Sequence, residues 1–93
     1  MRWYYGACVE VDSLEREYST AMMARYLPAA KYLAFTVEGP VAEIAPAYDR
    51  TWELVAALHE GKPSCSVNLE LYDERFTGPD DPQSRMDLLF PAP

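Results

Sequence analysis

Glu70 is the residue of this chain whose type and position are best suited to chemistry. It lies in a segment of strict two-residue alternation, in which Cys65, Val67, Leu69 and Leu71 point one way and Ser66, Asn68, Glu70 and Tyr72 the other. A carboxylate in the middle of a strand, between an amide and a phenol, is either solvated or set in a polar pocket. In a pocket, the carboxylate would neutralise a cation and aromatic ring faces would bind it through their quadrupoles. The alternative is a solvated sheet face with a few surface aromatics.

Aromatic residues at the start of the chain are the other candidates for such a site. Trp3, Tyr4 and Tyr5 belong to a segment that alternates from Trp3 to Val11 and therefore predicts a strand. If this strand lies near the one that carries Glu70, its rings line the same surface. The candidate ligand-binding residues are therefore Glu70, Tyr72, Asn68, Trp3, Tyr5 and Tyr4.

Catalytic and metal-binding signals are weak by comparison. The chain has one histidine, His59, so it offers almost no possibility for a catalytic arrangement of the Ser/His or Cys/His type. We expect His59 to be an exposed residue in the last turn of a helix. The sequence has no glycine-rich phosphate loop, and its two cysteines without nearby histidines make no zinc site. We expect no catalytic residue, no metal and no cofactor.

The bulk composition limits the partners. The 93 residues predict one small domain over 1–93, and 8 basic against 15 acidic residues give a formal net charge of −7. That balance argues against nucleic acid and against an anionic membrane surface, both of which attract basic patches. Apolar runs stay well short of the roughly 20 residues of a membrane span, and the N-terminus lacks the pattern of a signal peptide. We therefore expect a cytoplasmic protein in which Cys8 and Cys65 are reduced and half-buried.

Periodicity predicts an α+β fold of the order β-β-β-α-β-β. The predicted strands are Trp3–Val11, Ala21–Leu27, Lys31–Glu38, Cys65–Tyr72 and Arg85–Phe90, and the helix is Val41–His59. Gly39 and Pro40 mark the start of the helix, and Gly61 follows its end. Pro46 lies inside the helix, where it predicts a kink or a broken first turn. A single helix covers one face of an antiparallel sheet, so we expect Glu70, Asn68 and Tyr72 on the uncovered face.

Several segments in order resemble one known family. They are Pro28–Pro40, the Ala47–Tyr48 pair within the helix, Leu69–Phe76 with its Glu-x-Tyr-x-x-x-Phe spacing, and Met86–Pro91. Together they resemble the gyrase-inhibitor-like (GyrI-like) effector-binding domains, which occur alone or attached to AraC-type and MerR-type regulators. The resemblance runs from about Tyr4 to Pro91. One departure is Ala30, where the family often has glycine at the turn.

The resemblance implies a fold and a site. The family domain is a tandem of two strand-helix-strand-strand modules around a ligand groove, and Lys31–Phe90 corresponds to the second module alone. The strand Trp3–Val11 corresponds to the closing strand of the first module, whose initial strand and helix have no counterpart here. Family members bind amphipathic, often cationic, aromatic compounds with a mid-strand glutamate, and Glu70 matches that position. The implied function is binding of a small amphipathic cationic aromatic molecule in a groove on the open sheet face.

The resemblance also leaves alternatives. Some relatives hydrolyse strained electrophilic molecules, in which case Glu70 would act as a base for water. A gyrase-inhibitor-type module that contacts a protein partner is the other alternative. The missing half of the tandem predicts a homodimer, in which an uncovered face bearing Trp3, Tyr4, Tyr5 and Tyr72 is buried between two copies. Alternatively, the sequence is part of a longer chain, or the small form stands alone.

Overall fold

The computed structural model describes residues 6–8, 27, 29–60, 62 and 67–93. In these ranges the elements are β1 (Tyr32–Glu38), the 3-10 helix η1 (Val41–Glu43), α1 (Ile44–Leu58), β2 (Leu69–Leu71) and β3 (Arg85–Pro91). This order confirms the predicted α+β fold and its single strand-helix-strand-strand module. The predicted strands Trp3–Val11 and Ala21–Leu27 lie outside the described residues, except for 6–8 and Leu27, which have no regular secondary structure.

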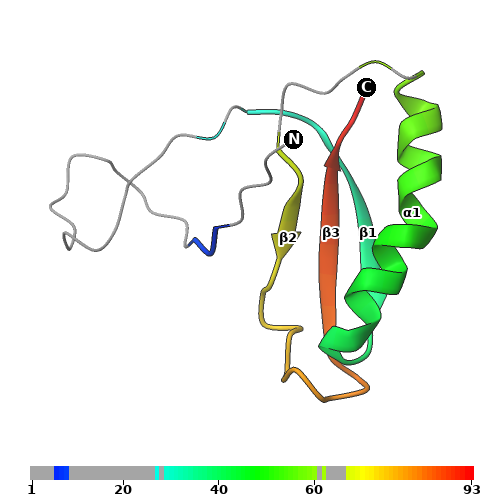
Figure 1. Cartoon of the computed structure of the whole chain (residues 1–93). Helices are drawn as coiled ribbons and strands as arrows, with labels where there is room; N and C mark the ends of the chain where they lie inside the picture. The colour runs from blue at the N-terminus through cyan, green and yellow to red at the C-terminus, as the bar shows by residue number, and fades with distance from the viewer. Residues whose placement is uncertain (1–5, 9–26, 28, 61, 63–66) are drawn as a thin grey trace, which may run out of the picture.

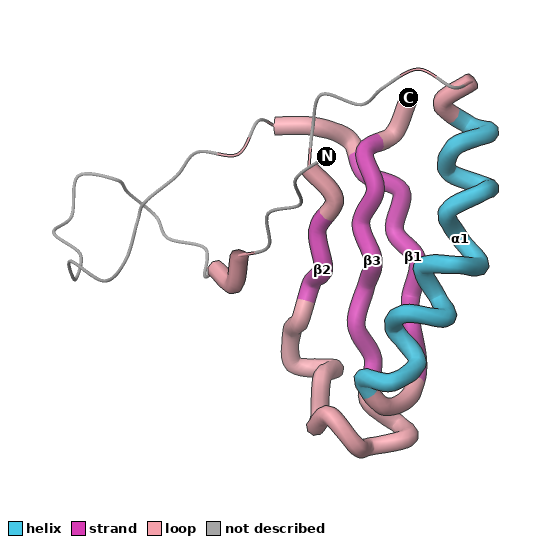
Figure 2. Tube along the Cα trace, in the orientation of Figure 1, coloured by secondary structure: helices cyan, strands magenta, loops and turns pink. Residues whose placement is uncertain are grey.

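The strands form an antiparallel sheet in the order β1-β3-β2, so the last strand in the chain is central (Figure 2). Phe35 of β1 and Glu70 of β2 both pair with Leu88 of β3, from opposite sides. Residues that pair directly across an antiparallel ladder point to the same face of the sheet. The register therefore fixes which side chains share a face.

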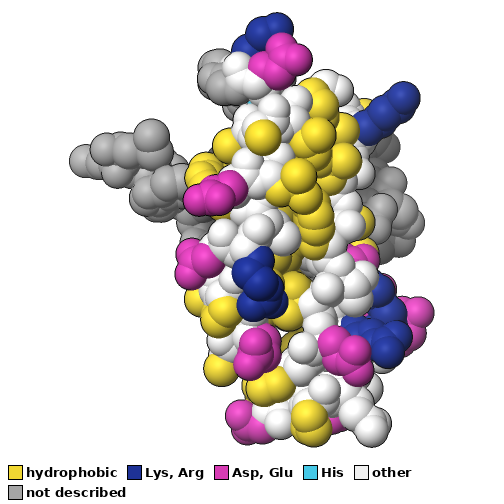
Figure 3. Space-filling model, turned by 90° about the vertical axis from the view of Figure 1, so that its right-hand side faces the viewer, with side chains coloured by type: hydrophobic (Ala, Val, Ile, Leu, Met, Phe, Trp, Pro, Cys, Tyr) yellow, Lys and Arg dark blue, Asp and Glu magenta, His cyan; other side chains and the backbone are white. Residues whose placement is uncertain are grey.

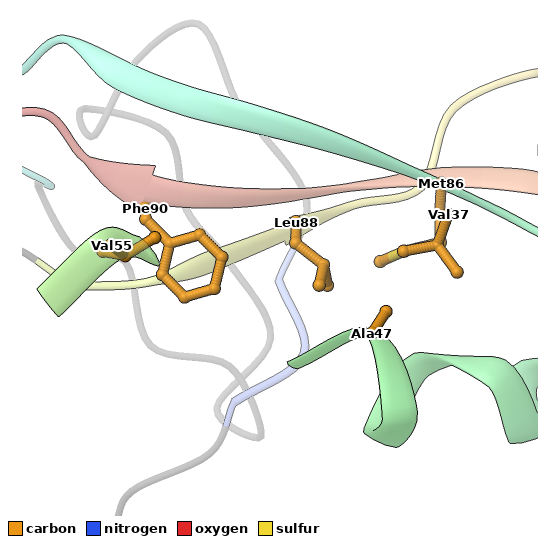
Figure 4. Packing of buried hydrophobic residues seen from close by; sticks show 6 residues of the cluster. All are labelled: Val37, Ala47, Val55, Met86, Leu88 and Phe90. Atoms are coloured by element: carbon orange, nitrogen blue, oxygen red, sulfur yellow. The ribbon is translucent and has the colours of Figure 1, made fainter. Parts of the chain in front are cut away.

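The core lies between α1 and one face of β1 and β3. Its buried members are Val37, Ala47, Val55, Met86, Leu88 and Phe90. Phe90 lies beside Val55 at one end of this cluster, whereas Val37 and Met86 lie above Ala47 at the other (Figure 4). As a result, α1 runs in the same direction as β3, and β2 contributes no buried side chain among its described residues.

The helix begins close to the predicted position. Gly39 has a φ of +120°, which a side chain would strain, and Pro40 is extended before η1. Pro46 predicts a kink or a broken first turn in the helix. The structure has a break of this kind at the start, where the 3-10 turn η1 precedes α1. Pro46 itself is the third residue of α1, where a backbone N–H has no partner within the helix, so the proline costs no hydrogen bond.

The loop between β2 and β3 is tied to the start of the helix. The Gly39 N–H donates to the Ser84 carbonyl at 2.8 Å, and the Val41 N–H donates to the Pro79 carbonyl at 2.8 Å. Ser84 is fully buried, and its hydroxyl oxygen accepts a hydrogen bond from the Thr77 N–H at 3.0 Å. These bonds hold the β1–α1 connection and the β2–β3 loop in one position relative to the sheet.

Two expectations about the whole chain can be compared with the described ranges. None of their helices has the length and apolar character that a membrane crossing requires. Cys8 is exposed, so its predicted half-burial is wrong; it lies in 6–8, outside the sheet and the helix, where it has no place in the core. Cys65 lies outside the described residues.

Candidate functional site

Glu70 is the middle residue of β2 and points to the same side of the sheet as α1. It pairs with Leu88, which is fully buried in the core beneath the helix. The expectation that Glu70, Asn68 and Tyr72 lie on the face away from the helix is therefore wrong. The physical reason is that, among the described residues, the buried core side chains opposite α1 come from β1 and β3, so a residue of β2 can share the helix-bearing face without lying under the helix.

The arrangement of the elements leaves that part of the face accessible. Figure 1 shows α1 beside β1, with β3 between β1 and β2. Glu70 is only part-buried, and Tyr72 directly beyond the strand is 46% exposed. A carboxylate is thus held on a regular strand, beside a helix, without full loss of solvent.

Two phenols lie within the electrostatic reach of Glu70. Burial raises the pKa of Tyr48 on α1, and the negative charge of Glu70 raises it further, with a smaller contribution from Tyr72. The pKa of Tyr72 is also raised, first by burial and then by the Glu70 carboxylate. Both effects favour neutral phenols, so Glu70 lies near two phenol groups that stay uncharged at neutral pH.

The chain turn after β2 fixes Tyr72. Asp73 accepts the Arg75 N–H on its carboxylate at 3.0 Å, and its carbonyl accepts the Phe76 N–H at 3.0 Å. This turn ends β2 at Leu71, one residue before the predicted end at Tyr72. The strand begins at Leu69; 67 and 68 have no regular secondary structure, and the predicted start at 65–66 lies outside the described residues. The turn also brings Phe76 back against Tyr72, with ring centroids 5.0 Å apart and planes at 86°. Such an edge-to-face contact orients the phenol.

Four residues therefore gather on one surface, which we call the Glu70 cluster: Tyr48, Glu70, Tyr72 and Phe76. Of the residues predicted from the sequence, the structure brings Glu70 and Tyr72 together. Asn68 is exposed and directly precedes β2, and alternation places it on the same side. Trp3, Tyr4 and Tyr5 lie outside the described residues. Tyr48 was not predicted as a site residue, because its place on the apolar stripe of the helix indicates a core residue.

His59 lies away from this cluster. It follows α1 as the C-cap residue, is half-buried rather than exposed as predicted, and its Nε2 is hydrogen-bonded to the carbonyl oxygen of Pro91. The contact joins the end of α1 to the end of β3. The role that the geometry gives to this histidine is structural.

The opposite face of β2 has a different character. Leu69 and Leu71 pair with Leu89 and Asp87 of β3, so these side chains share the face away from α1. Arg75 donates to Asp73 at 2.9 Å and to Asp87 at 2.8 Å. Hydrogen bonds from Arg75 lower the pKa of both carboxyl groups, and the two aspartates in turn raise the pKa of Arg75. Charges on this face are therefore paired with each other.

Comparison with known proteins identifies the family to which the chain belongs. The model of a family described as integron-associated effector-binding protein (Cass2) matches residues 1–92. The chain is also 32% identical over 99 residues to the transcriptional regulator BrlR of Pseudomonas aeruginosa, an alignment that covers 94% of this chain and 37% of the relative. The chain thus spans little more than a third of that regulator's length. Because the family model covers nearly all of the chain, the predicted resemblance is confirmed: the chain belongs to the integron-associated effector-binding proteins of the GyrI-like family.

Proposed function

We propose that this chain binds a small, amphipathic, cationic aromatic molecule at the Glu70 cluster. The observation that carries the proposal is the position of the Glu70 carboxylate in the middle of β2, within electrostatic reach of the phenols of Tyr48 and Tyr72. The family supplies the general class, since effector-binding proteins take small molecules. The cluster supplies the expected chemistry of this one.

The charge and the rings favour the same kind of ligand. A carboxylate that is partly removed from water attracts a cation more strongly than a fully solvated one does. Each ring face adds about 0.5–2 kcal/mol of cation–π attraction, depending on how much water is excluded. The chain's net charge of −7 works in the same direction over longer distances. A neutral or anionic molecule of the same shape gains none of these contributions.

Titration calorimetry with a cationic triarylmethane dye tests the proposal. Glu70→Gln keeps the shape and removes the charge, and we expect it to weaken binding at least tenfold, or about 1.4 kcal/mol. Glu53→Gln is the matched control, because Glu53 is an exposed carboxylate of α1 outside the cluster. It should change the affinity by less than about 1 kcal/mol. Equal affinities of the wild type and Glu70→Gln would overturn the cation-binding function.

The predicted homodimer also remains a proposal, and we place its contact on a different surface from the one that the sequence predicted. We propose that a second copy covers the face of the sheet away from α1. That face carries Leu69, Leu71 and Leu89, and the charge of Asp87 on it is paired with Arg75. Two copies that each carry a net charge of −7 repel each other, so an apolar surface with paired charges is the favourable place for contact. Tyr72, which the sequence assigned to the dimer contact, points to the other face.

Light scattering after size exclusion tests this contact. We expect the wild type to be a dimer and Leu71→Asp to be a monomer, because Leu71 is 43% exposed on the proposed contact face. Leu54→Asp on α1 is the control, since Leu54 is a similarly exposed leucine outside that face, and it should leave the dimer intact. A wild-type monomer at micromolar concentration would overturn the proposal.

A further inference from the structure

Arg75 lies three residues beyond Tyr72 in the chain, yet its side chain reaches the face of the sheet away from α1. Its Nε donates to the Asp73 carboxylate at 2.9 Å, and its two terminal nitrogens donate to the two oxygens of Asp87 at 3.2 and 2.8 Å. Arginine is the basic side chain that can make such a forked contact. The hydroxyl of Thr36 on β1 donates to the same Asp87 carboxylate at 2.8 Å. Arg75 is thereby connected to the central strand of the sheet, and through it to β1.

The backbone of Arg75 is attached to the same central strand. The Arg85 N–H donates to the Arg75 carbonyl at 3.0 Å, and Arg85 precedes Asp87 by two residues of β3. The Arg75 N–H donates to the Asp73 carboxylate at 3.0 Å, which closes the turn on itself. β2 has already ended at Leu71, so these contacts continue the attachment to β3 beyond the last ladder pair. Arg75 therefore fixes the turn after β2 to the sheet.

Phe76 holds the same turn from the other face of the sheet. It is half-buried and packs against the hydrophobic core under α1, whereas the preceding Arg75 reaches the opposite face. Figure 3 shows that the side of the molecule that carries α1 has a strip of hydrophobic side chains on its surface. On the α1 side, the ring of Phe76 makes its edge-to-face contact with Tyr72. Two adjacent residues of the turn are thus fixed on opposite faces, and one of them contacts the phenol of the Glu70 cluster.

The position of Tyr72 depends on this turn, because Tyr72 lies between the end of β2 and the turn itself. Its side chain is 46% exposed, so packing surrounds the ring only in part. Burial is nevertheless the larger cause of its raised pKa, and the Glu70 carboxylate is the second. A displacement of the turn would change both the exposure of the phenol and its distance from Glu70.

We infer that Arg75 is a positioning residue of the ligand site, which holds Tyr72 beside Glu70 from the opposite face of the sheet. The inference rests on the proposed function, in which Tyr72 supplies one of the rings that contact the cation. Arg75 acts through the turn and not on the ligand, since its own positive charge repels a cation. Loss of the Arg75 side chain therefore has two opposite effects: the displaced ring weakens binding of a cation, and the removed charge strengthens it.

Titration calorimetry with the cationic triarylmethane dye separates the two effects. Arg75→Met and Arg85→Met each remove one positive charge, and both arginines serve the same face of the sheet, so the two variants attract a cation to a similar degree. Only Arg75→Met releases the turn, and we expect its affinity to be roughly twofold to fivefold below that of Arg85→Met, as for one ring face at a partly exposed site. In a Tyr72→Ala background the two variants should bind alike, because Arg75 acts through Tyr72.

Carbon NMR of labelled tyrosine rings gives a second measurement that needs no ligand. Arg75→Met should lower the pKa of Tyr72 toward the ordinary value of about 10, although loss of a positive charge alone would raise it. The pKa of Tyr48 should stay raised, since its own burial persists. Val55→Ala is the control for a general loss of stability: Val55 is buried beside Phe90, at the end of the core away from the turn, and both tyrosines should titrate there as in the wild type.

The outcomes separate this inference from the proposed function. If Glu70→Gln weakens dye binding and Arg75→Met binds the dye as Arg85→Met does, only the role of Arg75 is overturned. A pKa of Tyr72 that does not fall in Arg75→Met has the same meaning. If Glu70→Gln leaves the affinity unchanged, the proposed function itself fails, and the tyrosine titration still tests whether Arg75 positions Tyr72. Circular dichroism confirms the fold of each variant, and Arg75→Lys, which keeps the charge without the fork, should shift the pKa of Tyr72 in the same direction by less.

Discussion

The two sides of β2 place their charged side chains in different surroundings. On the side that shares α1, the Glu70 carboxylate faces the phenols of Tyr48 and Tyr72. On the other side, Arg75 pairs with both Asp73 and Asp87 between leucine side chains. The second arrangement places opposite charges next to each other, whereas the first brings a carboxylate and two neutral phenols together. The two sides of one short strand therefore differ in the kind of group that lies beside a carboxylate, and the proposed ligand site is on the side with the phenols.

The strongest test of this contrast removes one leucine from each face of β3. Leu88→Ala should lower the free energy of unfolding by about 2–5 kcal/mol, because Leu88 is fully buried between the sheet and α1. Leu89→Ala, on the other face and only part-buried, should cost about 1 kcal/mol. Urea denaturation at low protein concentration gives both values. Equal losses would mean that the two faces are covered to the same degree, and would contradict the asymmetry described here.

A smaller effect is expected from the paired charges. Arg75→Ala should lower the free energy of unfolding slightly at pH 7, by less than Leu89→Ala does, since it breaks a partly exposed network of charges. Arg85→Ala is the matched control and should have almost no effect, because its ion pair with Glu38 spans 3.7 Å and is more than half exposed. Similar losses in the two variants would show that Arg75 has no special role.

The pH dependence of the same pair follows from the lowered pKa values of Asp73 and Asp87. A carboxyl group with a pKa below its unfolded value of about 3.9 stabilises the fold above that pH, and the contribution is lost as the pH falls through the folded pKa. The difference in stability between the wild type and Arg75→Ala should therefore be constant near neutrality. It should shrink below about pH 4, as acid denaturation of both proteins will show. A difference that does not begin to shrink as the pH falls below about 4 would contradict the charge-pair explanation.

The smallest expected effect concerns the two phenols. Removal of the Glu70 charge in Glu70→Gln should lower the pKa of Tyr48 and of Tyr72, yet leave both above the ordinary value of about 10 because burial, the larger cause, persists. Carbon NMR of labelled tyrosine rings measures both values during an alkaline titration. Glu53→Gln should leave them in place. An unchanged titration in Glu70→Gln would contradict the proximity on which the Glu70 cluster rests.

Much of the module could be predicted from the sequence because its signals are local. Gly39 and Pro40 determine the start of the helical segment, and alternation locates β1 and β3 to within a residue at each end. The end of β2 is also within a residue of the prediction, and the turn that follows it is stabilised by the Asp73 side chain. Here a side-chain hydrogen bond competes with continuation of the strand.

The position of the site could be predicted only in part. Alternation shows that Glu70 and Tyr72 share a side, but it does not say which side the helix covers. That choice depends on the pairing of Glu70 with Leu88, a contact between residues distant in the chain. Tyr48 was missed for a related reason: an aromatic residue on an apolar helical stripe reads as core, and only the lateral offset of α1 from β2 brings it beside a carboxylate.

The central position of β3 has a consequence for how the chain acquires its structure. β1 and β2 are joined only through β3, which follows both of them in the sequence. During synthesis neither strand can complete its ladder until residues 85–91 have left the ribosome, so the apolar face of α1 stays uncovered until then. Closure also has to bring together residues some fifty positions apart, as in the Thr36–Asp87 hydrogen bond, which slows folding relative to a local hairpin. We expect nascent chains that stop before β3 to be substrates for chaperones.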